Sequence, residues 1–92
     1  MPRKINFHIN NRCIPNRSGV YIVHDEVGVL DVGESGRVGK RIKRHERRVC
    51  WARSAVGEVR VSVVWTPYKK RAGRRAIECE LRDELDPECG DR

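Results

Sequence analysis

The chain has 92 residues, of which 38% are hydrophobic and 36% charged, so it can form one small domain over residues 1–92. Its net charge of +7 favours a polyanionic partner, with nucleic acid the first choice. No apolar run approaches the roughly 20 residues of a membrane span, and the first residues lack the apolar stretch of a secretory signal, so we expect a cytoplasmic protein.

Hydrophobic alternation predicts strands in the first part of the chain. Apolar and polar residues alternate over residues 5–9, which indicates a short first strand. Residues 20–23 and 29–32 are rich in β-branched side chains and flank a polar turn at residues 25–28, so they predict a hairpin. Residues 33–39 are rich in glycine and indicate a loop.

The second part of the chain predicts two helices separated by a strand. A basic helix begins near residue 38 and runs to about residue 51, and its inner face comprises Val38, Ile42, Val49 and Cys50. Valines alternate over residues 59–65 and predict a strand. A last helix covers residues 72–85, with Ile77, Leu81 and Leu85 facing the core, and Pro87 stops it.

This order of elements predicts an α/β domain of the α+β type. A small, mainly antiparallel central sheet is flanked by helices, and the core extends over about residues 15–87. The four cysteines, Cys13, Cys50, Cys79 and Cys89, form neither a C-x-x-C pair nor a zinc spacing with the histidines. In a reducing cytosol we expect free thiols, with Cys79 a candidate for the core.

Basic residues gather in two stretches, at 37–53 and at 69–75. A solvated basic surface is one interpretation, and a nucleic-acid interface is the stronger one because both stretches flank the candidate catalytic positions. The residues that we expect to bind nucleic acid are Lys40, Arg44, Arg47, Arg48, Lys69 and Lys70.

Four side chains suit the cleavage of a phosphodiester bond. Tyr21 could position or deprotonate a water if nearby cations lowered the pKa of its phenol from about 10. Arg41 could hold the scissile phosphate through two oxygens, and His45, one helical turn on, could shuttle a proton. Glu78 could bind a hard divalent ion, Mg²⁺ or Mn²⁺, with waters completing the shell. Each of these four side chains could instead have a purely structural role; for Glu78 that role is a salt bridge to Arg82 or Arg74.

These residues resemble the motifs of the GIY-YIG nuclease superfamily from about residue 15 to residue 87. Gly19-Val20-Tyr21 is similar to the first motif, and Asp31-Val32-Gly33 occupies the place of the second. Arg41 and His45 match the Arg-x-x-x-His/Tyr of the first helix. Glu78 matches the metal-binding glutamate, and Pro87 matches the proline that follows it.

The resemblance implies a divalent-metal-dependent endonuclease, with DNA favoured as the substrate. Asp31 replaces the usual tyrosine, so it is an additional base, a metal ligand or a mark of lost catalysis. Cys89-Gly90 stands where an asparagine often follows the proline.

If the resemblance holds, we expect Tyr21, Arg41, His45 and Glu78 to converge on one concave face. The alternative functions are a nucleic-acid-binding module without catalysis and a protein adaptor that docks through its acidic C-terminal end. A chain this short would be non-specific, form a homodimer or take its specificity from a protein partner.

Overall fold

The computed structural model describes residues 5–9, 14–44 and 47–90. The chain forms a four-stranded sheet with the strand order β1-β4-β2-β3, in which all neighbouring strands are antiparallel. The strands are β1 (Ile5–Ile9), β2 (Gly19–His24), β3 (Val29–Ser35) and β4 (Arg60–Trp65). The helices are α1 (Val38–Lys43), α2 (Arg48–Ser54) and α3 (Arg71–Leu85). The predicted fold class is confirmed.

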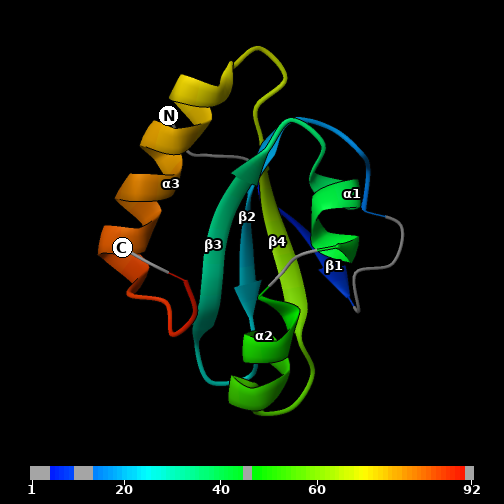
Figure 1. The fold of residues 1–92 in the computed structure, drawn as a ribbon, viewed down its shortest axis with the longest axis vertical. Helices are drawn as coiled ribbons and strands as arrows, with labels where there is room; N and C mark the ends of the chain where they lie inside the picture. The colour runs from blue at the N-terminus through cyan, green and yellow to red at the C-terminus, as the bar shows by residue number, and fades with distance from the viewer. Residues whose placement is uncertain (1–4, 10–13, 45–46, 91–92) are drawn as a thin grey trace.

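The sheet is covered on both faces, as Figure 1 shows. Alternate residues of the strands point to opposite faces, so each face has its own apolar cluster. One cluster joins strand residues to α1 and α2, and its members include Tyr21, Val23, Val63, Ile42 and Trp51. The other joins strand residues to α3, and its members include Val20, Ile22, Val32, Val64 and Leu81.

The single basic helix predicted over residues 38–51 is in fact two short helices. In a continuous helix of 3.6 residues per turn, Ile42 and Trp51 would point about 180° apart. The break between α1 and α2 lets both side chains enter the same core, where each is buried. The sequence also placed Val49 on the inner face of the basic helix and Leu85 on the inner face of the last helix. Both expectations are wrong, because Val49 is 61% exposed and Leu85 lies at the surface.

The segment after α3 folds back over the outer edge of β3. The Cys89 N–H donates to the Leu30 carbonyl at 2.7 Å, and the Arg82 guanidinium donates to the Val32 carbonyl. These bonds satisfy carbonyls that an edge strand otherwise leaves open. The fold-back also brings Cys89 to α2, where it forms a disulfide with Cys50.

The expectation of free thiols is therefore wrong for Cys50 and Cys89, and Cys79 is exposed rather than in the core. Cys13 lies outside the described residues. Within the part of the chain that the structure describes, no helix has both the length and the apolar character needed to cross a bilayer.

Candidate functional site

A basic hollow of about 370 Å³ opens where β3 ends and α1 begins. Its lining among the described residues is Ser35, Gly36, Arg37, Lys40, Arg41 and Arg44, which include four cations and no acid. The segment before β2 holds α1 in place: the N–H of Val38 donates to the carbonyl of Arg17 at 2.9 Å, and the N–H of Lys40 donates to Asn16 Oδ1 at 3.0 Å. The hollow thus presents fixed positive charge to solvent, which suits an anionic ligand.

Tyr21 lies on β2 and is only 1% exposed. It pairs across the hairpin with Gly33, and a Cβ at Gly33 would come 2.2 Å from the phenol oxygen. Glycine is required there because any side chain would displace the ring. The Arg41 guanidinium hydrogen-bonds to the Tyr21 side chain. The structure therefore brings together two of the predicted site residues.

Burial raises the pKa of Tyr21 to about 12, although the positive charge of Arg41 acts in the opposite direction. The expectation that nearby cations lower this pKa is therefore wrong, because desolvation of the phenolate is the larger effect. At neutral pH the phenol stays protonated. Since it is also buried, Tyr21 is not placed to act as a base.

Asp31, the residue that replaces the second-motif tyrosine, is fully buried in a hydrogen-bonded cluster. Its Oδ2 accepts from Arg47 Nε at 2.7 Å and from the indole Nε1 of Trp51 at 2.9 Å. Its Oδ1 accepts from Arg82 Nη2 at 2.7 Å and from the Val32 N–H at 2.8 Å. This carboxylate ties together α2, β3 and α3, and it has no solvent access for a base or a metal ligand.

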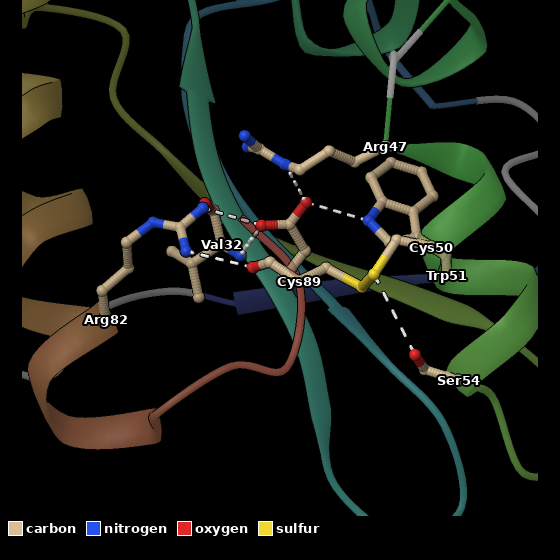
Figure 2. Close-up of a disulfide and its surroundings, with 8 residues drawn as sticks. Val32, Arg47, Cys50, Trp51, Ser54, Arg82 and Cys89 are labelled. Atoms are coloured by element: carbon tan, nitrogen blue, oxygen red, sulfur yellow. Dashed lines mark hydrogen bonds and ion pairs between the residues drawn. A yellow bond between two sulfur atoms is a disulfide. The ribbon is translucent and has the colours of Figure 1, made fainter. Parts of the chain in front are cut away.

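Arg82, which the sequence suggested only as a salt-bridge partner of Glu78, is central to this cluster. Its side chain is 8% exposed, and besides Asp31 and the Val32 carbonyl it donates to the Cys89 carbonyl at 3.3 Å. Its Nε lies 3.5 Å from Glu78 Oε2. Figure 2 shows the side chains of Arg82 and Arg47 on opposite sides of the carboxylate that both of them bind, with the Cys50–Cys89 disulfide nearby.

Gly90 leaves the space that the Arg82 guanidinium occupies beside Asp31. Its φ is +90°, a conformation that L side chains rarely adopt, and a Cβ there would lie 2.7 Å from Arg82 Nη2 and 3.0 Å from Asp31 Oδ1. The two positions at which the chain departs from the nuclease motifs therefore lie next to each other. An aspartate in the second motif and a glycine after the proline together make room for a buried ion pair.

The predicted residues do not all meet on one concave face. Tyr21 and Arg41 lie on the face covered by α1 and α2, whereas Glu78 lies on α3, which packs against the other face. Arg82 contacts both Glu78 and Asp31 and so links Glu78 to the first face. His45 lies outside the described residues.

The geometry of Glu78 suits a metal ligand in part. Its side chain is 23% exposed, and its contact with Arg82 at 3.5 Å is longer than a strong ion pair, so the carboxylate is accessible. No group of three histidine, cysteine or acidic side chains occurs among the described residues. Glu78 therefore fits a site with one protein carboxylate and several waters, as Mg²⁺ often uses, and not an all-protein cage.

Four of the residues expected to bind nucleic acid lie away from the hollow. Arg47 pairs with Asp31, and Arg48 donates to the Ile42 carbonyl at 2.8 Å, so both guanidinium groups are engaged within the domain. Lys69 and Lys70 are exposed before α3 but do not line the hollow.

The second basic stretch is partly neutralised near the hollow. Glu34 on β3 pairs with Arg74 at 2.7 Å, and both side chains are 13% exposed. Arg71 lies 3.9 Å from the same carboxylate. Arg37, which the sequence placed only in the basic stretch, joins Lys40, Arg41 and Arg44 as a hollow residue.

Comparisons of the chain with protein-family models, curated proteins and solved structures found no match. The resemblance to GIY-YIG nucleases thus depends on the motifs, their spacing and the order of the elements that carry them.

Proposed function

We propose that the chain binds the phosphodiester backbone of nucleic acid in the basic hollow and cleaves it as a divalent-metal-dependent endonuclease, with DNA as the favoured substrate. One observation carries the proposal. Arg41 lines the open hollow and also hydrogen-bonds to Tyr21 of the first motif, so the motif residue and the anion-binding surface form one unit. The sequence favours the cytoplasm as the compartment, whereas the Cys50–Cys89 disulfide is typical of an oxidising compartment.

In this proposal Arg41 contacts the scissile phosphate. Its guanidinium is always charged and can bond two phosphate oxygens at once, which stabilises the charge that grows during water attack. Tyr21 is a positioning residue: its protonated phenol holds Arg41 in one orientation. Arg37, Lys40 and Arg44 neutralise the neighbouring phosphates along the strand.

The motif resemblance gives Glu78 as the residue that would hold Mg²⁺ or Mn²⁺. Because Glu78 lies on α3 and does not line the hollow, a metal held there would stabilise the leaving oxygen only of a strand that passes around the edge of β3. The motif resemblance adds His45 as the candidate proton carrier. Arg82 contacts Glu78 and therefore orients its carboxylate at the edge of β3.

A cleavage assay across duplex, branched and single-stranded DNA and RNA, with Mg²⁺, Mn²⁺ or EDTA, tests the proposal. We expect metal-dependent cleavage that Glu78→Gln abolishes while nucleic-acid affinity is kept, because the amide retains the shape but not the charge. Asp83→Asn, which removes an exposed acid from the same helix, is the matched control and should cleave normally. Cleavage that persists in EDTA or in Glu78→Gln would contradict the proposal.

The second candidate is a nucleic-acid-binding module without catalysis, and the buried Asp31 favours it. A carboxylate that is shielded from solvent and held by Arg47, Trp51 and Arg82 leaves the second motif without an accessible catalytic group. Binding without cleavage under every metal condition would select this candidate. For either candidate function, the endonuclease or the binding module, a homodimer or a protein partner would supply the specificity.

A further inference from the structure

The end of the sheet that lies away from the hollow exposes three apolar side chains. Val27 in the β2–β3 turn is 76% exposed, Val56 before β4 is 54% exposed, and Leu85 ends α3. All three border one hollow of about 320 Å³, and Val27 and Leu85 also border an adjoining hollow of about 410 Å³. We call these three residues and the acids around them the turn-end surface.

The turn-end surface is held by hydrogen bonds. Asp25 Oδ1 accepts from the N–H groups of Val27 and Gly28, each at 2.8 Å, and its Oδ2 accepts from the Val56 N–H at 2.7 Å. The Glu26 N–H donates to the Val56 carbonyl at 3.2 Å. The two loops are thus tied to each other, so the valines are presented in a defined arrangement.

The charge of this surface is opposite to that of the chain. Although the chain has a net charge of +7, no lysine or arginine is among the described residues that line the two hollows. The acids that line them are Asp25, Glu26, Asp86 and Glu88. Three backbone N–H donors lower the pKa of Asp25, so its carboxylate is ionised at neutral pH.

We propose that the turn-end surface docks a basic, amphipathic segment of a partner protein. Apolar side chains of the segment would cover Val27, Val56 and Leu85, and its lysines or arginines would face the acidic rim. Nucleic acid would be repelled by this rim. A second copy of the chain is less suited, since two molecules of net charge +7 repel each other.

The position of the surface leaves the basic hollow free. The hollow lies where β3 ends at Ser35, and the turn-end surface lies where β3 begins at Val29, so the seven residues of the strand separate them by about 20 Å. Figure 1 shows the β2–β3 turn and the β3–α1 connection at opposite ends of the molecule. A partner docked here could therefore act together with bound nucleic acid, and the inference holds whether or not the chain is a nuclease.

Calorimetry and amide chemical-shift mapping with a short amphipathic peptide of leucine and lysine test the inference, in about 0.1 M salt to limit non-specific attraction. We expect shifts at the turn-end surface. The double substitution Val27→Ser and Leu85→Ser should weaken binding about tenfold or more, which corresponds to about 1.4 kcal/mol. Val49→Ser, at an exposed valine on α2, is the matched control and should bind like the unmodified protein.

Three results would overturn the inference. One is unchanged affinity in the double variant or an equal loss in Val49→Ser. Another is equal binding of a control peptide in which glutamate replaces lysine. The third is a dimer in sedimentation experiments that the double variant abolishes, because the occupant would then be a second copy.

Discussion

The most demanding prediction about stability concerns the buried carboxylate of Asp31 and the side chains that bind it, Arg47, Trp51 and Arg82. Asp31→Asn keeps the shape of the side chain but removes the charge between Arg82 and Arg47, whose side chains are 8% and 27% exposed. Removing one partner of a buried ion pair costs about 3–5 kcal/mol because the remaining charge is left unpaired. A domain of this size loses about 4–8 °C in Tm per kcal/mol, so the melting temperature should fall by about 12 °C or more.

Thermal unfolding followed by circular dichroism measures this fall, with Asp83→Asn on α3 as the exposed control. A double-mutant cycle sharpens the test. Arg82→Met removes the guanidinium while keeping most of the length, so Asp31→Asn should cost less in the Arg82→Met background, with a coupling of about 1 kcal/mol or more. A Tm for Asp31→Asn close to that of the control, or additive effects in the cycle, would refute the ion-pair account.

Three further predictions concern the core of the site. Reduction of the Cys50–Cys89 disulfide, which spans 39 residues, should lower the free energy of unfolding by about 4 kcal/mol in a denaturant titration. Gly33→Ala should displace the Tyr21 ring and cost about 1–3 kcal/mol in the same titration. In a Tyr68→Phe variant, the absorbance of phenolate should report Tyr21 ionising near pH 12, and stability should be lost as pH rises from about 10 to about 12, because the folded state holds the proton more tightly.

Each of these predictions has a contradicting result. Gly28→Ala is the control for the glycine, since no atom lies within 4 Å of a Cβ built there, and equal losses in the two variants would contradict the packing argument. Unchanged stability on reduction would show that the fold-back segment holds without the disulfide. A phenol that ionises near pH 10 in the folded protein would contradict the burial of Tyr21.

Local sequence patterns predicted the parts of the fold that depend on local periodicity. The hairpin, the strand around Val61 and Val63 and the helix after Pro67 all follow from alternation and from breakers, and the structure has each of them. The predicted basic helix was wrong because periodicity along one helix does not reveal a break that turns both Ile42 and Trp51 toward the same core.

The candidate site was predictable only where spacing carries it. Tyr21 and Arg41 lie together, as the motif order suggested. The partners of Asp31 are 16, 20 and 51 residues away in the chain, so no local pattern could reveal that this carboxylate is buried. Gly90 was noticed only as a departure from the motif; its contact with Arg82 required the fold.

The binding of phosphates in the basic hollow underlies both candidate functions, and the salt dependence of DNA affinity tests it most directly. If the four cations of the hollow contact phosphates, log K should fall with log salt at a slope of about −3.6. Fluorescence anisotropy should show that the double reversal Lys40→Glu and Arg44→Glu flattens the slope to about −1.8 or less steep. The matched reversal Arg53→Glu and Arg75→Glu, at exposed residues outside the hollow, should change the slope less. Equal flattening in the two variants, or affinity that does not respond to salt, would contradict the account.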